Sequence, residues 1–399
     1  MKKKEKRIFI ITGEPSGDLH ASNLGRSLKE MLPNIKLSGM GGEKMRQAGV
    51  DTVQDITSLA VIGFVEVFKN LVHFRRVFNL LTKELDRQKP DVVVLVDYPG
   101  FNLKFAKEVK KRGIPLIYYI SPQVWAWGKG RIKTIKKLVD KMIVLFKFEE
   151  ELYKKASVPV VFVGHPLLDN LKKNEIKNLN NEKITSVLDL NLSSNKTNSA
   201  IESKNVHSDN LVIGLLPGSR KGEVQRILPI MLRTGEIIFS QLKNAHFLLS
   251  MSSNVSKNIY QQIIKKSSLS ISFAETNECF QQANLLLICS GTATLEATLY
   301  QKPMLVIYKT SFLTALLAKL LIKIPYIALI NIAAGEKVVP EFIQYKAKPQ
   351  RIAKKAIELI KNKHKREKVK EKLRKAALNL GESGASKRAA EIICGYLAA

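Results

Sequence analysis

The chain has 399 residues, 45% of them hydrophobic and 25% charged, which is the composition of a globular protein long enough for two domains. Its 65 basic and 35 acidic residues give a net charge of +30, which favours a polyanionic partner unless it reflects a compositional bias toward Lys. Three cysteines without a C-x-x-C pair argue against a disulfide framework and a structural zinc site, and the sequence has no run of 18 apolar residues that predicts a membrane span.

Short apolar runs alternate with amphipathic segments in the first half of the chain. The run at 7–13 follows a basic N-terminus and is too short for a signal peptide, so we expect a first strand, a helix over 18–32 and a cytoplasmic protein. The Val/Leu run in 91–100 is typical of a parallel strand buried on both faces. Further buried strands are predicted at 114–121, 141–146 and 158–164. This alternation predicts βαβ units and a doubly wound sheet.

An amphipathic helix is predicted over 61–81, with a broad apolar side and a polar stripe. It is either a core helix or a helix lying in a membrane surface that contains acidic lipids, because basic residues stand beside several Phe. A second apolar run punctuated by Lys covers 312–330. Two such runs in a basic chain favour contact with an anionic membrane surface. The residues that we assign to this contact are Phe64, Val67, Phe68, Leu71, Arg75 and Arg76.

The regular pattern stops at 172–210, where 39 residues include nine Asn, six Ser and six Lys and no Gly or Pro. We expect a linker or surface insertion there. Buried strands are predicted again at 211–220, 245–251, 285–291 and 303–309. The final segment is helical and basic, and its charge is either a solvated helix face or a face that attracts phosphate. The predicted divisions are an N-terminal Rossmann-like domain (1–171), the linker (172–210), a C-terminal Rossmann-like domain (211–348) and the basic helical segment (349–399).

A glycine-rich turn at 13–18 follows the first predicted strand. In open α/β sheets, ligands bind at such turns, beyond the carboxyl ends of the strands. The turn lacks the G-x-G-x-x-G fingerprint of dinucleotide binding and the P-loop pattern of nucleoside triphosphatases. It is therefore either a ligand-binding turn of another kind or a structural one.

Two turns in the second half could bind a diphosphate. At 216–220, Gly218 permits a tight turn, Ser219 could cap the next helix, and Arg220 is suited to gripping a phosphate unless it only pairs with Glu223. At 290–296, Ser290, Gly291, Thr292 and Ala293 form the start of a helix whose N–H groups can bind a diphosphate, and Glu296 follows where it can take ribose hydroxyls. The alternative for the second turn is an ordinary helix start. Together the two turns describe a nucleotide-diphosphate site, and the sequence has no Asp-x-Asp triplet for a metal.

Asp97 is the strongest candidate for a general base. It ends the strand VVVLV, at the edge of the sheet where ligands bind, and could remove the proton from an attacking hydroxyl. Turn capping is the alternative role. His165, in a Gly-His-Pro turn, is a second candidate, although a histidine at a domain junction is more often structural.

Five motifs in this order resemble the lipid-A-disaccharide synthase family of inverting glycosyltransferases with the GT-B fold. They are GEPSGDLHA (13–21), SPQVWAW (121–127), GHPLLD (164–169), LPGSRKGEV (216–224) and SGTATLEA (290–297). The resemblance covers nearly the whole chain. It implies two Rossmann-like domains facing a central cleft, peripheral association with the inner membrane and no metal or cofactor.

The resemblance also implies the reaction. UDP-2,3-diacylglucosamine would donate its sugar to 2,3-diacylglucosamine 1-phosphate, giving a β-1,6-linked disaccharide 1-phosphate of lipopolysaccharide synthesis and UDP. On the family pattern Asp97 is the base, Arg220 an essential arginine and Glu296 the ribose-binding carboxylate. Asn331 falls in a donor-site loop, and Glu14, Ser16, Gly17 and Asp18 line the acceptor side.

Two alternatives stay open. One is a UDP-N-acetylglucosamine 2-epimerase-like enzyme, which shares the twin-Rossmann design. The other is a nucleic-acid-binding protein, suggested by the charge of +30, although no recognised motif supports it and no nucleic-acid partner is expected. The sequence does not indicate an oligomeric state.

Overall fold

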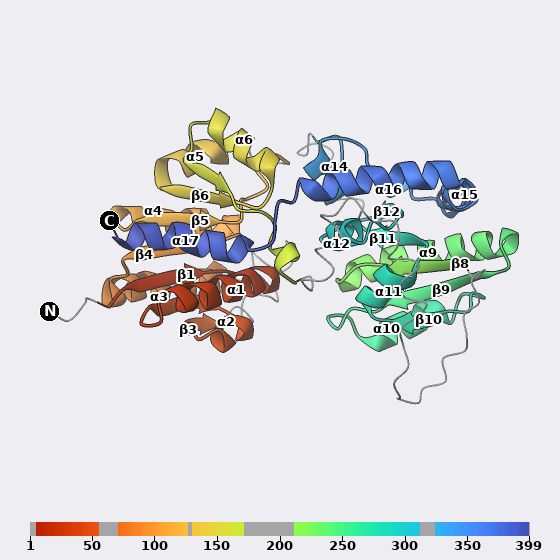
Figure 1. The fold of residues 1–399 in the computed structure, drawn as a ribbon. Coiled ribbons are helices and arrows are strands. Elements are labelled where there is room, and N and C mark those ends of the chain that lie inside the picture. Colours follow the sequence, from red (N-terminus) through yellow and green to blue (C-terminus); the bar gives the residue numbers. More distant parts are fainter. Residues whose placement is uncertain (1–4, 56–70, 127–129, 171–210, 312–323, 399) are drawn as a thin grey trace, which may run out of the picture. The chain divides into compact units, whose positions relative to one another are not determined.

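The computed structural model describes residues 5–55, 71–126, 130–170, 211–311 and 324–398. The chain divides into two compact units. Unit 1 contains residues 1–171 and 380–399, and unit 2 contains residues 172–379. Each unit is built around one parallel sheet, and Figure 1 shows the elements of both.

Unit 1 has a seven-stranded parallel sheet in the order β3-β2-β1-β4-β5-β6-β7. Its strands are β1 (Arg7–Ile11), β2 (Lys36–Gly41), β3 (Asp51–Asp55), β4 (Val92–Val96), β5 (Leu116–Tyr119), β6 (Lys141–Val144) and β7 (Val160–Phe162). Its helices are α1 (Pro15–Met31), α2 (Glu43–Gln47), α3 (Leu71–Gln88), α4 (Pro99–Lys111), α5 (Arg131–Leu138), α6 (Lys147–Lys155), the 3₁₀ helix η2 (Pro166–Asn170) and α17 (Ala385–Ala398).

Helices cover both faces of this sheet because its central strands are apolar on both sides. In β1, Phe9 and Ile11 pack with residues of α3 and α4, whereas Ile8 and Ile10 pack with residues of α1 and α17. Successive side chains of a strand point to opposite faces, so an uninterrupted apolar run feeds two cores. All four side chains are fully buried.

Unit 2 has a six-stranded parallel sheet in the order β10-β9-β8-β11-β12-β13. Its strands are β8 (Leu211–Leu216), β9 (Ala245–Ser250), β10 (Ser272–Ala274), β11 (Leu285–Cys289), β12 (Met304–Tyr308) and β13 (Glu341–Ile343). Its helices are α9 (Lys221–Gln241), α10 (Lys257–Ile264), α11 (Thr276–Gln282), α12 (Ala293–Leu299), α14 (Leu329–Ala334), α15 (Pro349–Lys361) and α16 (Lys363–Leu378), with the 3₁₀ helix η3 (Gln344–Lys346). α9 and α15 pack on one face, and α12 contacts α14 and α16.

Both sheets reverse their strand order at one point. In unit 1 the order runs outward in opposite directions from the β1–β4 pair, and in unit 2 from the β8–β11 pair. The loops after two such strands diverge, so a crevice opens beyond their carboxyl ends, and ligands of doubly wound proteins bind there. The turns singled out in the sequence follow these four strands.

The chain returns to unit 1 at its C-terminus, where α17 runs beside α1 (Figure 1). The motif GHPLLD holds this helix. The Asp169 carboxylate accepts hydrogen bonds from the backbone N–H groups of Gly384, Ala385 and Ser386 at 2.6, 3.1 and 3.1 Å. The Arg388 guanidinium on α17 donates to the carbonyl oxygen of Val163 at 2.9 and 2.6 Å. The basic segment predicted over 349–399 is thus divided, with α15 and α16 in unit 2 and α17 in unit 1.

Replacing Asp169 by Ala should destabilise unit 1 by about 2 kcal/mol, because three N–H groups at the start of α17 lose a charged acceptor. Chemical denaturation followed by circular dichroism measures the change. The control is Glu391→Ala, which removes an exposed carboxylate from the same helix and should shift the midpoint little. Equal midpoints for wild type and Asp169→Ala would show that this contact does not hold α17.

The predicted fold class is confirmed, since both halves are doubly wound parallel α/β domains. The central cleft and the domain boundaries stay predictions. The structure adds four strands to those predicted from apolar runs, namely β2, β3, β10 and β13.

Candidate active site

The turn after β1 contains two glycines that have no room for a side chain. A Cβ on Gly13 would lie 2.2 Å from Cδ1 of the Tyr98 ring, and a Cβ on Gly17 would lie 2.0 Å from Oγ1 of Thr12. The turn therefore packs directly against the segment that follows β4. Gly17 permits this close approach, and its place on the acceptor side stays a prediction.

The polar residues of this turn lie in different surroundings. Glu14 and Ser16 are exposed and available to a ligand. Asp18 is only 5% exposed, and its carboxylate accepts hydrogen bonds from three backbone N–H groups at the start of α2, at 2.7 to 3.2 Å. The structure thus gives Asp18 a capping role, in which it holds α2 beside the turn.

Asp97 follows β4 beside this turn, with a left-handed backbone φ of +48°. Its side chain is half-buried, and burial is the main reason why its pKa rises to about 7. The negative charge of Glu14 raises the pKa further, and a hydrogen bond from the Tyr98 N–H opposes the rise. No side chain forms a capping hydrogen bond at the start of α4. A carboxylate with a pKa near neutrality can take up and release a proton at physiological pH, as a general base must.

His165, the other candidate base, is buried, with 6% of its surface exposed. Its Nδ1 accepts a hydrogen bond from the Leu167 N–H at 3.2 Å, and its ring packs on Phe146 with centroids 5.3 Å apart. Burial and the charge of His20 lower its pKa to about 3. The imidazole is therefore neutral and structural, and it helps to shape the turn that holds α17.

The turn after β8 requires glycine at position 218. Gly218 has φ +107°, and a Cβ there would lie 2.5 Å from Oε2 of Glu223 and 3.2 Å from Sγ of Cys289. The same Glu223 oxygen accepts the backbone N–H groups of Ser219 at 3.2 Å and Arg220 at 3.3 Å. Glu223 thus fixes the turn from the first turn of α9.

Arg220 projects into solvent from this turn. Its side chain is 80% exposed, and its Nη1 lies 3.6 Å from Oε1 of Glu223. The ion pair considered in the sequence is therefore present, but an exposed pair at this distance holds the guanidinium weakly. Arg220 remains available to an anionic ligand.

The turn after β11 carries N–H groups without partners among the described residues. Ser290 is fixed, because its Oγ donates to the carbonyl of Ile327 at 2.9 Å. Gly291 and Thr292 directly precede the short helix α12, and Ala293 is its first residue. Their N–H groups donate to no residue in the described part of the chain. Such groups are suited to an anion.

The two turns of unit 2 lie side by side. β8 pairs with β11, with Leu216 opposite Ile288, so both turns begin at the same sheet edge. Burial raises the pKa of the Cys289 thiol to about 12; the charge of Glu223 adds to this rise and that of Arg220 opposes it. Glu223 and Arg220, from the turn after β8, are therefore close enough to affect Cys289, the last residue of β11. The sequence predicted both turns, and the structure brings them together.

Glu296 is half-buried on α12, one turn after these N–H groups. Burial raises its pKa, and its carboxylate has no partner among the described residues. A partly buried acceptor without a partner is suited to ligand hydroxyls.

Asn331, which the sequence places in a donor-site loop, is held by hydrogen bonds within the chain. It is fully buried in α14, its Oδ1 accepts the N–H groups of Val338 and Val339 at 2.9 Å, and its Nδ2 donates to the Val339 carbonyl at 2.9 Å and to Glu341 at 2.8 Å. All its hydrogen-bonding positions are used within the chain. Asn331 therefore orders the segment whose Ile327 carbonyl accepts the Ser290 hydroxyl, and its place in a donor-site loop stays a prediction.

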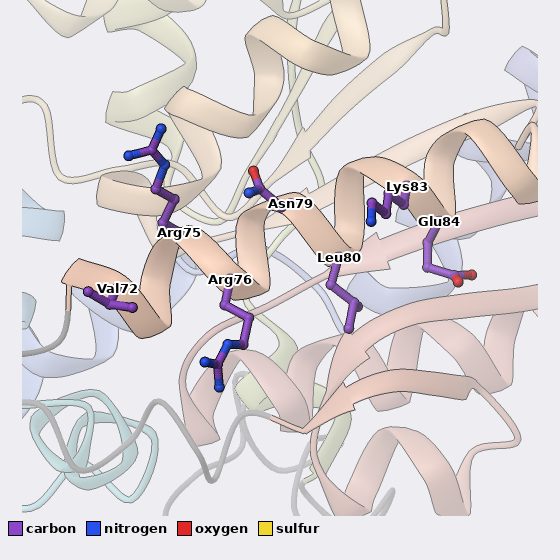
Figure 2. Close-up of a pocket in the computed structure, with 7 residues that line it drawn as sticks. All are labelled: Val72, Arg75, Arg76, Asn79, Leu80, Lys83 and Glu84. Atoms are coloured by element: carbon purple, nitrogen blue, oxygen red, sulfur yellow. The ribbon is translucent and has the colours of Figure 1, made fainter.

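The residues assigned to a membrane surface are only partly described. Phe64, Val67, Phe68 and the side chain of Leu71 lie outside the described part of the chain. Arg75 and Arg76 are exposed on α3, on the face that lines an open hollow of about 500 Å³ (Figure 2). The lining residues recur at helical spacing and are Val72, Arg75, Arg76, Asn79, Leu80, Lys83 and Glu84.

The opposite face of α3 belongs to the core. Val77 is buried, and Phe74 and Phe78 pack on Phe101 with ring centroids 6.0 and 5.7 Å apart. The core interpretation therefore holds for this face, and contact of the other face with a membrane stays a prediction. The aromatic side of α3 is a core face, and its outer face combines cations with exposed Val72 and Leu80.

Sequence reasoning missed a buried carboxylate beside the motif SPQVWAW. Glu149 is 3% exposed and accepts the indole N–H of Trp125 at 3.1 Å, and burial raises its pKa to about 8. It is one of three consecutive glutamates, and nothing in the sequence marks which one turns inward.

Among the described residues, no group of three or more His, Cys, Asp or Glu side chains could hold a metal ion. No described helix is long and apolar enough to cross a membrane.

Comparison with known proteins identifies the family. The sequence model of lipid-A-disaccharide synthetase matches residues 8–191 and 185–393. The chain belongs to this family. The prediction from the five motifs is confirmed, and the chain is a glycosyltransferase of lipid A biosynthesis.

Curated relatives of this family match along most of the chain. The lipid-A-disaccharide synthase of Syntrophus aciditrophicus (strain SB) is 39% identical over 388 residues, covering 96% of this chain and 96% of the relative. That of Coxiella burnetii (strain CbuG_Q212) is 38% identical over 392 residues, covering 97% and 98%. The lipid-A-disaccharide synthase 1 of Legionella pneumophila (strain Paris) is 40% identical over 342 residues, covering 85% and 84%.

Solved structures share the fold at low identity. The kitacinnamycin glycosyltransferase superposes with a TM-score of 0.62 at 14% identity, covering 99% of this chain and 100% of that one. The UDP-GlcNAc 2-epimerase of Neisseria meningitidis, solved with UDP-GlcNAc, has a TM-score of 0.58 at 15% identity, covering 98% and 99%. The fold is thus common to transferases and epimerases, and the sequence match decides for the lipid-A-disaccharide synthase family.

Proposed function

We propose that the chain joins UDP-2,3-diacylglucosamine to 2,3-diacylglucosamine 1-phosphate, forming the β-1,6-linked lipid A disaccharide 1-phosphate and UDP. The observation that carries this proposal is the family match, which extends over both units. The geometry supports a different part of the reaction in each unit. Unit 1 offers a proton acceptor beside an exposed turn, and unit 2 offers an anion site beside a free carboxylate.

The chemical step in this proposal is a single displacement. The 6-hydroxyl of the acceptor transfers its proton to the Asp97 carboxylate while its oxygen bonds to the anomeric carbon of the donor. The bond from that carbon to the UDP oxygen breaks, and its electron pair leaves with UDP. Attack opposite the leaving group inverts the anomeric centre. Asp97 is suited to this step because its pKa of about 7 leaves it substantially ionised at neutral pH yet basic enough to take a proton.

The leaving diphosphate needs positive charge where its own negative charge develops. We assign this task to the exposed Arg220 guanidinium and to the free N–H groups of Gly291, Thr292 and Ala293. Cationic and N–H donors of this kind can stabilise such a charge without a metal ion. Glu296 would accept the two ribose hydroxyls, since its carboxylate is half-buried and has no described partner.

The acceptor is a lipid, and we propose that α3 holds unit 1 against an anionic cytoplasmic membrane surface. Support comes from the outer face of α3, where Arg75, Arg76 and Lys83 stand beside Val72, which is 75% exposed, and Leu80, which is 36% exposed. Basic residues near an anionic surface contribute about 1 kcal/mol each, and exposed apolar side chains enter the interface.

The double variant Arg75→Ala/Arg76→Ala should bind vesicles of mixed neutral and anionic phospholipid roughly 10- to 30-fold more weakly at low salt, since two cations are lost. Co-sedimentation measures the binding. The matched control, Lys136→Ala/Lys137→Ala, removes two exposed cations from α5 and should bind at least three times more tightly than the α3 variant. Equal weakening by both variants would show that net charge, and not this face, directs the chain to the surface.

The reaction itself is tested by incubating the chain with both proposed substrates and analysing the lipid product by mass spectrometry. The expected product has the mass of the two diacylglucosamine units joined with one phosphate, and UDP appears in equal amount. Conversion of UDP-N-acetylglucosamine to its 2-epimer, without joining of acylated sugars, would establish the epimerase alternative and overturn the proposal.

A further inference from the structure

The segment that carries Asp97 has an uncommon backbone. Asp97 and Tyr98 both have φ +48°, so two consecutive residues with side chains lie in the left-handed region. A single such residue costs of the order of 1 kcal/mol, and the surrounding structure must hold it in place. Strain of this kind concentrates at functional sites.

Two buried side chains meet at the carbonyl oxygen of Asp97. The Asn102 Nδ2 donates to it at 2.7 Å from α4, and the Tyr118 hydroxyl donates to it at 2.6 Å from the neighbouring strand β5. Both side chains are fully buried. Asn102 also donates to the carbonyl of Val96 at 3.3 Å, so it spans the two peptides on either side of the Asp97 α-carbon.

These contacts orient the catalytic carboxylate through one peptide group. The carbonyl held by Asn102 and Tyr118 belongs to the peptide between Asp97 and Tyr98. The N–H at the other end of that peptide is close enough to the Asp97 carboxylate to lower its pKa. Because a peptide is planar, fixing its carbonyl also fixes the direction of its N–H.

We propose that Asn102 and Tyr118 are positioning residues, which hold the strained Asp97–Tyr98 turn so that the Asp97 carboxylate points at the acceptor hydroxyl. The inference rests on the proposed role of Asp97 as base. A core role alone needs neither polar atom, because Phe at 118 and Leu at 102 would fill nearly the same space without buried polar groups that require partners.

Tyr118→Phe and Asn102→Leu test the proposal against wild type, Asp97→Ala and the control Tyr260→Phe. The control removes a buried tyrosine hydroxyl in unit 2, which accepts the Ser252 N–H at 3.0 Å. Tyr118→Phe should lower kcat roughly 10- to 100-fold, as misplacement of a reacting group by about 1 Å does, with KM for both substrates within about twofold. Asn102→Leu should have an effect of the same order, and Tyr260→Phe should keep the wild-type kcat. Circular dichroism and thermal unfolding establish that each variant is folded.

The pH profile separates positioning from a general structural defect. Burial is the largest cause of the raised pKa of Asp97, with the neighbouring Glu14 charge second and the Tyr98 N–H opposing. Releasing the turn lets water reach the carboxylate, which lowers its pKa, and moves the Tyr98 N–H away, which raises it. Because burial is the largest cause and the N–H the smallest, the pKa should fall and the acid limb of kcat/KM should move to lower pH in Tyr118→Phe.

The outcomes distinguish the positioning role of Asn102 and Tyr118 from the proposed role of Asp97 as base. If Asp97→Ala is inactive while Tyr118→Phe and Asn102→Leu keep the wild-type kcat, the positioning role is wrong and the base survives. If Asp97→Ala stays active, both are wrong. Three other results for Tyr118→Phe would also overturn the positioning role. They are an activity loss that comes from a raised KM, an acid limb at its wild-type pH, and an equal loss of kcat in Tyr260→Phe.

Discussion

Replacing Asp97 by Ala is expected to reduce kcat by about 10²- to 10⁴-fold while UDP affinity stays within about twofold of wild type, because a general base contributes that much to the chemical step and nothing to nucleotide binding. The carboxylate lies in unit 1, whereas the turns proposed to bind the diphosphate lie in unit 2. Its pKa of about 7 suits it to receive the acceptor proton. Steady-state kinetics measures kcat, and isothermal titration calorimetry with UDP measures the affinity.

Asp91 provides the matched control for this variant. It precedes the same strand, β4, at the end opposite to Asp97, and its carboxylate accepts the Arg7 N–H at 2.8 Å. Asp91→Ala should keep kcat near the wild-type value, although it removes a carboxylate from the same strand. If Asp97→Ala turns over at the wild-type rate, the base is another group and the mechanism proposed for unit 1 is wrong.

Replacing Arg220 by Ala should lower kcat/KM by about 10²- to 10³-fold and weaken UDP binding by roughly tenfold or more. The guanidinium is 80% exposed and only loosely paired with Glu223, so it is free to contact a diphosphate in the ground state and in the transition state. Arg220→Lys should recover part of the loss, since an ammonium keeps the charge but not the two-pronged geometry. The same kinetic and calorimetric measurements apply.

Arg226, exposed on α9, is the control for Arg220, which directly precedes this helix. Its Nη1 donates to the Gly222 carbonyl at 2.8 Å, and Arg226→Ala should leave UDP affinity nearly unchanged. Equal losses of affinity from the two variants would mean that the positive charge of α9 as a whole, and not Arg220 in the turn, attracts the nucleotide.

The fold could be predicted where strands are buried on both faces. β4 and β11 are uninterrupted apolar runs, and such runs have few alternatives to a central parallel strand. β2 and β3 could not be found in this way. β2 contains Gly39, whose α-carbon packs so closely on the Ile10 carbonyl that a Cβ would lie 1.9 Å from its oxygen, and β3 at the sheet edge reads DTVQD. Because β2 contains glycines and β3 is mainly polar, neither strand forms an apolar run in the sequence.

The candidate site was predictable where chemistry and strand ends coincide. Gly218 and Arg220 follow β8, and Asp97 follows β4, so sequence order alone places them at the ligand edge of a sheet. The backbone contacts of Asp18 and Asn331 were not predictable, because the groups that each side chain binds are brought to it by the fold. Tyr118 was hidden for the same reason, since its ring belongs to an ordinary core strand and only the structure shows where its hydroxyl points.

The return of α17 to unit 1 was also hidden. Composition describes residues 351–399 as one basic helical stretch with 14 Lys and Arg and five Asp and Glu. The contacts that separate α17 from α16 come from Asp169 and Val163, more than 200 positions earlier. Pairings over such distances leave no local signal in a single sequence.

The pH dependence of kcat/KM for the unmodified enzyme tests the account most directly, because it reports the ionisation of the base in the free protein. Only ionised Asp97 can accept the proton, so with a pKa of about 7 the rate should fall tenfold per unit well below pH 7 and level off above pH 8. The acceptor phosphate also ionises near pH 6, so Asp97→Asn serves as the reference, in which the limb near pH 7 should disappear and only that of the phosphate can remain. A rate that is flat from pH 5 to 9, or a limb near pH 7 that persists in Asp97→Asn, would contradict a carboxylate base at the end of β4.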